Sequence, residues 1–189
     1  MDIQALTGGF ANPPADASHA FRAALNAMAR PGSVEEVVST DAPIGISTAA
    51  AVLLLTLCDH ETPLYLAPSH DLPVLRDWIA FHIGAPLVER QTAMFALGTW
   101  EDLTPLTDFP IGTAEYPDRS TTVIVETDSI SAEGVRLTGP GIKESAFLNL
   151  PEPGVFAVNN ALYPQGLDFF LTAGTQLAAV PRSTRIEVL

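Results

Sequence analysis

Residues 47–57 read Ser-Thr-Ala-Ala-Ala-Val-Leu-Leu-Leu-Thr-Leu, and a second apolar run follows at residues 63–67. The first run is apolar almost all round, which predicts a helix buried on every side and capped by Ser47 or Thr48. The second run predicts a strand. A buried helix that leads directly into a strand is typical of folds in which helices and sheet pack in layers.

Two further helices are expected on either side of this stretch, at residues 16–30 and 69–82. In the first, Phe21, Leu25 and Met28 recur at helical spacing and predict its inner face. Asp16 or Ser18 can cap its start, and Pro31-Gly32 ends it because proline cannot continue the hydrogen-bond ladder. In the second, Leu72, Leu75 and Ile79 predict the inner face, and Ser69 is the expected cap.

Short runs of β-branched and large apolar residues predict the strands. They lie at residues 34–38, 93–97, 121–126, 135–138, 155–158, 176–180 and 185–189. A last helix is expected at residues 166–173. Because the runs at 121–126 and 135–138 follow one another, they predict a hairpin and hence a mixed sheet. We therefore expect one α/β domain over residues 1–189, a single-domain mixed sheet with flanking helices.

The charge and cysteine content of the chain limit which partners it can bind and which cellular compartment it suits. The formal net charge is −13, with a single lysine, and such a chain repels nucleic acid and anionic membranes at long range. The amino-terminal residues lack a basic segment followed by an apolar one, which predicts no signal peptide. The single cysteine, Cys58, fits a reducing compartment, so we expect a cytoplasmic protein. Because Cys58 follows an apolar run, it is interpreted as a small buried hydrophobe rather than a nucleophile.

A search for reactive groups gives no self-evident active site. The four histidines do not form a zinc-binding spacing. His60 and His70 adjoin acidic residues, so each is either half of a metal site completed from elsewhere or part of an ordinary acidic loop; we favour the loop. No nucleophile elbow, phosphate-binding loop or dinucleotide fingerprint occurs. We therefore predict no catalytic residue, no metal and no cofactor.

Two segments remain as candidate sites for an anion or a partner. The turn Gly139-Pro140-Gly141 could precede a helix and hold an anion on backbone amides, or be an ordinary turn. Lys143 follows it and is either a surface lysine, which we favour, or a Schiff-base lysine.

The second candidate is the segment Arg182-Ser183-Thr184-Arg185 near the carboxyl terminus. Two guanidinium groups and two hydroxyls in four residues could bind phosphate or carboxylate. They could equally form ion pairs or lie in an interface, where arginine is enriched, and we favour that interpretation. The candidate anion or interface site therefore comprises Arg182, Ser183, Thr184 and Lys143.

Six segments, in order along nearly the whole chain, resemble the PhnH family, a component of the core of the bacterial carbon–phosphorus lyase complex. They are residues 21–32 (Phe-Arg-Ala-Ala-Leu-Asn-Ala-Met, then Pro-Gly), 53–63, 81–86 (Phe-His-Ile-Gly-Ala-Pro), 137–142 (Leu-Thr-Gly-Pro-Gly-Ile), 163–168 (Tyr-Pro-Gln-Gly-Leu-Asp) and 181–188. Tyr163 and Leu167 stand where the family more usually has phenylalanine and isoleucine, and Ile83 where it more usually has threonine.

The resemblance implies a role in alkylphosphonate catabolism. It implies a subunit that assembles with subunits G, I and J, and that supports coupling of phosphonate to the ribose of a nucleoside triphosphate without catalysis of its own. It further implies a homodimer when isolated, and a fold similar to pyridoxal phosphate-dependent transferases that lacks the cofactor site. The alternatives are a subunit that binds phosphonate or nucleotide through its own arginines, and a free-standing pyridoxal phosphate enzyme. A chain with one cysteine cannot supply the clustered thiolates of an iron–sulfur site, which fits the non-catalytic interpretation.

Overall fold

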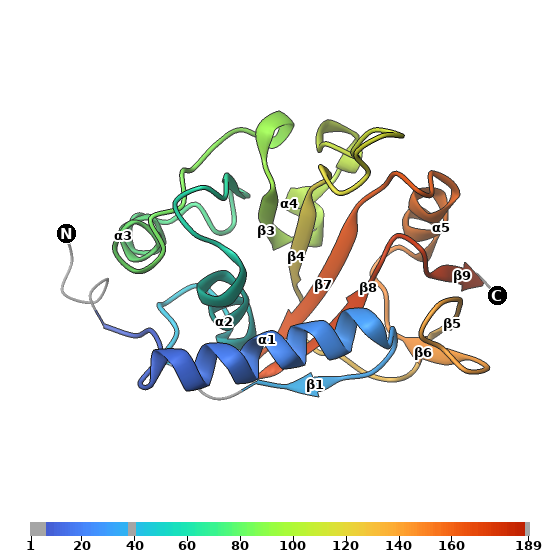
Figure 1. The fold of residues 1–189 in the computed structure, drawn as a ribbon, viewed down its shortest axis with the longest axis horizontal. Coiled ribbons are helices and arrows are strands. Elements are labelled where there is room, and N and C mark those ends of the chain that lie inside the picture. Colours follow the sequence, from blue (N-terminus) through green and yellow to red (C-terminus); the bar gives the residue numbers. More distant parts are fainter. Residues whose placement is uncertain (1–6, 38–40, 188–189) are drawn as a thin grey trace.

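The computed structural model describes residues 7–37 and 41–187, and it is built on a six-stranded mixed sheet (Figure 1). From one edge to the other its strands are β1 (Glu35–Glu36), β8 (Gln176–Val180), β7 (Asp168–Ala173), β4 (Thr122–Glu126), β3 (Phe95–Thr99) and β2 (Leu64–Leu66). The last four in this order are parallel to one another, whereas β8 and β1 run antiparallel to their neighbours. The predicted mixed α/β fold is confirmed.

A second, three-stranded antiparallel sheet lies at the end of the molecule that also holds the carboxyl terminus (Figure 1). Its order is β6 (Ala146–Leu148), β5 (Val135–Thr138) and β9 (Arg185–Glu187). The predicted hairpin between residues 121–126 and 135–138 is therefore wrong, because β4 pairs with β3 and β7 while β5 pairs with β6 and β9.

Helices cover both faces of the large sheet. The helices α1 (Pro13–Ala29), α2 (Thr48–Leu57) and α3 (Pro73–His82) pack against one face, and α4 (Trp100–Leu103), α5 (Pro153–Ala161) and the small sheet cover the other. Successive residues of the central strands alternate between these two cores: Leu97, Ile124 and Phe170 face the first, and Ala96, Val123 and Phe169 face the second. Two short 3₁₀ turns, Arg90–Thr92 and Leu106–Asp108, flank β3 and α4.

The helix predicted around residues 47–57 is confirmed as α2, which is buried along most of its length. Ser47 caps it, because its Oγ accepts a hydrogen bond from the Ala50 amide at 3.1 Å. The Glu126 carboxylate at the end of β4 in turn accepts hydrogen bonds from the amide and hydroxyl of Ser47, and from the hydroxyl of Thr172. These bonds tie the start of α2 to two central strands.

The inner face predicted for the first helix is wrong at two of its three residues, whereas Met28 packs against the core. Phe21 and Leu25 are 53% and 55% exposed on α1, whereas Ala20, Ala24 and Ala27 are buried. Alanine lets the helix backbone approach its neighbours closely, so the small residues face the core. Nor does Asp16 act as the cap: α1 begins at Pro13, and Asp16 accepts a hydrogen bond from the Asn12 amide one turn earlier.

Two predicted elements near the carboxyl terminus have the opposite type. The strand expected at residues 155–158 is part of helix α5, which starts with Pro153 in its first turn. The helix expected at residues 166–173 is strand β7, which lies between β4 and β8 and is buried on both faces. A strand buried on both faces has a continuous apolar run, and periodicity alone does not distinguish such a run from a buried helix.

The other predicted elements are confirmed with shifted ends. Strands β2, β3, β4, β5 and β8 begin and end within two residues of their predicted bounds. Helix α3 starts at Pro73 rather than Ser69, whose hydroxyl instead contacts His70 Nδ1 at 2.8 Å. Strand β1 covers only Glu35–Glu36 of the predicted 34–38, and Val38 lies outside the described residues, as do residues 188–189 beyond β9. Within the described part of the chain, no helix is both long and apolar enough to cross a membrane.

Candidate functional site

The segment 181–185, singled out from sequence, connects β8 to β9 at the amino-terminal edge of the parallel strands. Its side chains differ in burial: Arg182 is largely covered, Thr184 is buried and Arg185 is exposed. The two arginines therefore have different environments, although they are only three residues apart.

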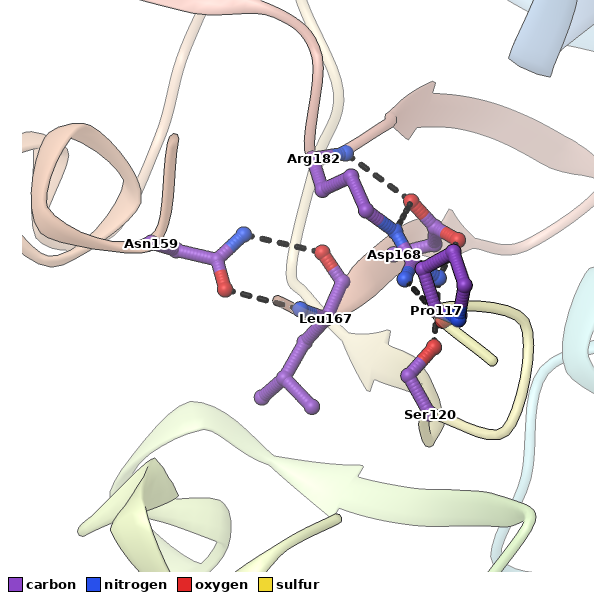
Figure 2. Close-up of polar contacts among 6 residues, drawn as sticks. All are labelled: Pro117, Ser120, Asn159, Leu167, Asp168 and Arg182. Carbon is purple, nitrogen blue, oxygen red and sulfur yellow. Dashed lines mark hydrogen bonds and ion pairs between the residues drawn. The ribbon is translucent and has the colours of Figure 1, made fainter. Parts of the chain in front are cut away.

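Arg182 points inward and is fully engaged by neighbouring residues (Figure 2). Its amide and Nε both donate to Asp168 Oδ1, at 2.9 and 3.1 Å, and its Nη2 forms an ion pair with Asp168 Oδ2. The same guanidinium donates to the Pro117 carbonyl and to the Ser120 hydroxyl. With its side chain only 13% exposed, Arg182 joins β7, β8 and the loop before β4 and has little capacity left for a ligand.

Asn159 of α5 holds the adjoining segment 163–168 in place. Its side-chain amide donates to the Leu167 carbonyl and its oxygen accepts from the Leu167 amide, both at 2.8 Å (Figure 2). Gly166 has a φ of +119°, and a Cβ there would lie 3.0 Å from the Asn159 side-chain oxygen. Glycine is therefore required for this close approach of loop and helix.

The turn Gly139–Gly141 packs against two other segments. A Cβ at Gly141 would collide with the Ala29 carbonyl at the end of α1, and one at Gly139 would lie 3.1 Å from the Ser183 carbonyl. The element that follows the turn is strand β6, so the helix considered from sequence does not form. Lys143 is exposed beyond this turn and does not join the Arg182 network.

A small surface pocket of about 300 Å³ lies where these segments meet. We call it the Arg185 pocket, and its lining residues are Pro140, Asn160, Tyr163, Ser183 and Arg185. Within residues 7–37 and 41–187, the guanidinium of Arg185 and the hydroxyls of Ser183 and Tyr163 have no hydrogen bond or ion pair. A cation and two hydroxyl groups that are free to bind can hold a carboxylate or a phosphoryl oxygen.

The structure thus divides the sequence-predicted site. Ser183 and the neighbouring Arg185 line the pocket, whereas Arg182 and Thr184 are turned into the protein and Lys143 lies apart. The hydroxyl of Thr184 has no hydrogen-bond partner among the described residues. Sequence reasoning missed Tyr163 and Asn160, which reach the pocket from the end of α5 and carry no local signal of binding.

The comparisons with known proteins identify the family of the chain. The family model described as bacterial phosphonate metabolism protein (PhnH) matches residues 8–187. The chain belongs to the PhnH family. The resemblance inferred from the six sequence segments is therefore confirmed.

Two curated relatives match over most of their own lengths. The alpha-D-ribose 1-methylphosphonate 5-triphosphate synthase subunit PhnH of Rhizobium meliloti (strain 1021) is 36% identical over 193 residues, covering 97% of this chain and 96% of the relative. The putative C-P lyase subunit protein HtxG of Stutzerimonas stutzeri is 29% identical over 180 residues, covering 89% and 85%.

Three of the six segments that resemble the PhnH family meet at the Arg185 pocket, and a fourth packs beside the turn 139–141. Pro140, Tyr163 and Ser183 line the pocket and come from three of these segments. The fourth ends at Pro31-Gly32, which packs against the 139–146 region: a Cβ on Gly141 would lie 3.2 Å from Pro31. Three segments that are distant in sequence are thus brought together at the end of the molecule that holds α5 and the small sheet.

A second polar cluster lies at the opposite, carboxyl-terminal edge of the parallel strands. His70 follows β2 and is buried, which lowers its pKa, while Glu126 and Asp102 oppose that shift. Asp102 accepts a hydrogen bond from the Ser69 amide at 2.8 Å. Among the described residues, no group of three or more histidine, cysteine, aspartate or glutamate side chains is arranged to hold a metal ion.

His60, the other histidine considered as half of a metal site, is exposed beside Glu61, and its Nε2 lies 4.0 Å from the Glu61 carboxylate.

Cys58 follows α2 and is buried, with 8% of its surface exposed. Burial, together with the neighbouring Asp59 carboxylate, raises the pKa of its thiol to about 12. Because the thiolate is both the nucleophile and the metal ligand, this residue is inert at neutral pH. Cys58 is a buried apolar residue, as the sequence predicts.

Proposed function

We propose that this chain is a subunit of an enzyme assembly that couples a phosphonate to the ribose of a nucleoside triphosphate in alkylphosphonate catabolism. The observation that carries the proposal is the match, over 97% of the chain, to a relative named as a subunit of alpha-D-ribose 1-methylphosphonate 5-triphosphate synthase. We propose that the chain contributes no catalysis of its own, is cytoplasmic, forms a homodimer when isolated, and assembles with subunits G, I and J of a carbon–phosphorus lyase complex.

Two properties of the chain support a non-catalytic role. Its single cysteine is buried and protonated, so it cannot ligate an iron–sulfur cluster. Its net charge of −13 opposes binding of a phosphonate and a triphosphate together, so the main anion sites belong on partner subunits.

We also propose a single domain whose fold is similar to that of pyridoxal phosphate-dependent transferases without the cofactor site. The support is a sheet in which four neighbouring parallel strands are followed at one edge by the antiparallel strand β8 and then β1, with the two cores on opposite faces of this one sheet. Such enzymes need a lysine for the Schiff base. The only lysine of this chain, Lys143, is exposed between β5 and β6, away from the large sheet, so the residues present do not fit the cofactor.

The experiment that tests the assembly is co-expression of this chain with subunits G, I and J, followed by native mass spectrometry of the purified material. We expect a stoichiometric complex that contains this chain. A chain that purifies only as a lone dimer, while the other subunits assemble without it, would contradict the proposed function.

The Arg185 pocket favours a second candidate function, a subunit that binds phosphonate or nucleotide itself. In that case the isolated chain binds a nucleoside triphosphate at millimolar or tighter affinity. Arg185→Gln should then weaken binding by at least about tenfold, or roughly 1.4 kcal/mol. Arg22→Gln, an exposed change on α1, is the matched control. Arg182 is unsuitable for this test because its guanidinium already has internal partners. A flat isothermal titration would eliminate this candidate.

A further inference from the structure

Helix α5 is unusual for an exposed helix of an acidic protein, because none of its residues is charged. Its sequence is Pro-Gly-Val-Phe-Ala-Val-Asn-Asn-Ala. Val158 is 67% exposed, and the following Leu162 and Tyr163 are 43% and 62% exposed. A helix that lies on the surface is normally polar on its outer face, and the cores of interfaces are depleted in charge. The outer face of α5 therefore has the character of a surface that another protein covers.

An apolar groove of about 390 Å³ runs along the same helix. Its walls come from α5 and from the segment after α4, and they include Pro105, Leu106, Ile111, Val155, Val158 and Leu162. The polar groups in its lining are mostly satisfied from within: both ends of the Asn159 amide bond to Leu167, and the Thr104 hydroxyl donates to the Glu101 carbonyl at 3.0 Å. The groove therefore offers few free hydrogen-bonding groups to a phosphate or nucleotide. Its apolar walls suit an apolar side chain instead.

The ends of this surface carry opposite charges. Glu152 lines the groove and immediately precedes α5, and its carboxylate has no hydrogen bond or ion pair with any described residue. At the other end of α5, Asn160 and Tyr163 line the Arg185 pocket together with the free guanidinium of Arg185. An occupant with complementary charge has a basic group near Glu152 and an acidic group near Arg185.

We infer that the α5 groove and the Arg185 pocket together dock another subunit of the assembly, through a segment whose apolar side chains enter the groove and whose carboxylate pairs with Arg185. The inference rests on the proposed function and names the surface that it uses. A second copy of this chain is the competing occupant, and the oligomeric state of the isolated chain tests it separately from capture by the other subunits. Arg185 is then an interfacial arginine that recognises a carboxylate, and not a ligand-binding residue.

Two variants test the surface. Val158→Asp places a charge in the apolar contact, and Arg185→Glu reverses the charge in the pocket; both positions are exposed, so the fold should be retained. Ile44→Asp, at a position 66% exposed in the turn before α2, is the matched control for the first, and Arg22→Glu for the second. In the co-expression experiment, each test variant should reduce capture by the other subunits on the order of tenfold or more, while both controls assemble like the wild type.

The outcomes separate this inference from the proposed function. Failure of the wild-type chain to assemble contradicts the proposed function itself. Assembly of the wild type together with undiminished assembly of Val158→Asp and Arg185→Glu overturns only the docking surface. Loss of the isolated homodimer in Val158→Asp, with normal capture by the other subunits, would assign the surface to a second copy instead. Binding of tripolyphosphate by the isolated wild-type chain but not by Arg185→Glu would overturn the role of Arg185 in recognising a partner.

Discussion

Replacing Phe156 with alanine should lower the free energy of unfolding by about 3–5 kcal/mol, as expected for removal of a buried aromatic side chain. Phe156 is 2% exposed and is the residue that anchors α5 to the large sheet. Its ring stacks on Trp100, with centroids 5.1 Å apart, and contacts Phe169 of β7 at 4.7 Å. Alanine would leave a cavity between helix and strand that this packed aromatic cluster has little freedom to fill.

The measurement is denaturant-induced unfolding followed by circular dichroism, with thermal unfolding as a second readout. For a chain of this size the expected change corresponds to a fall of roughly 10 °C in the melting temperature. Val158→Ala on the same helix is the control and should stay within about 0.5 kcal/mol of the wild type, because Val158 is exposed. Equal effects of the two changes would contradict the inward orientation of Phe156. A single transition in each protein is expected if the chain is one domain.

Replacing Arg182 with alanine should lower the free energy of unfolding by about 2–4 kcal/mol. The change removes the ion pair with Asp168 and the bonds to Pro117 and Ser120, and it leaves a largely covered carboxylate without its counter-charge. This expected destabilisation lies at or below that usually found when a buried ion pair is broken, because the Asp168 side chain is still 24% exposed. The same unfolding measurement gives the change in free energy.

A double-mutant cycle distinguishes this role from lost packing. Asp168→Ala alone should also destabilise the protein, whereas the double variant should be less destabilised than the sum of the two single variants, since it leaves no unpaired charge. Additive effects would show that the ion pair contributes little. Arg22→Ala, an exposed change on α1, should leave stability within about 0.5 kcal/mol.

The elements that the sequence predicted correctly share a clear local signal. Helix α2 combines a serine cap with ten helical residues that contain no glycine or proline, and β4 and β8 are short apolar runs bounded by polar or turn residues. Where the local sequence is compatible with either a helix or a strand, the packing against neighbouring elements determines which one forms. The run Asp168–Ala173 forms a strand because it lies between two others, and the segment around Phe156 forms a helix that covers them.

The candidate site shows the same division. The sequence directed attention to a segment of which Ser183 and Arg185 line a pocket. It could not distinguish Arg182 from Arg185, because their roles depend on which of them faces Asp168, a residue fourteen positions away in the chain. Tyr163 and Asn160 could not be predicted, because they reach the pocket only through the packing of α5 against the strand edge.

By itself, then, the sequence determined the layered α/β class, the buried helix at residues 48–57, the inert character of Cys58 and membership of the PhnH family. These properties depend on local composition, spacing and the order of short segments, which a linear sequence contains directly. Only the tertiary structure decided which face of α1 is buried, which arginine remains free, and that the uncharged helix α5 lies exposed beside an apolar groove. The physical reason is that burial and pairing are properties of contacts between distant segments, and those contacts exist only once the chain has folded.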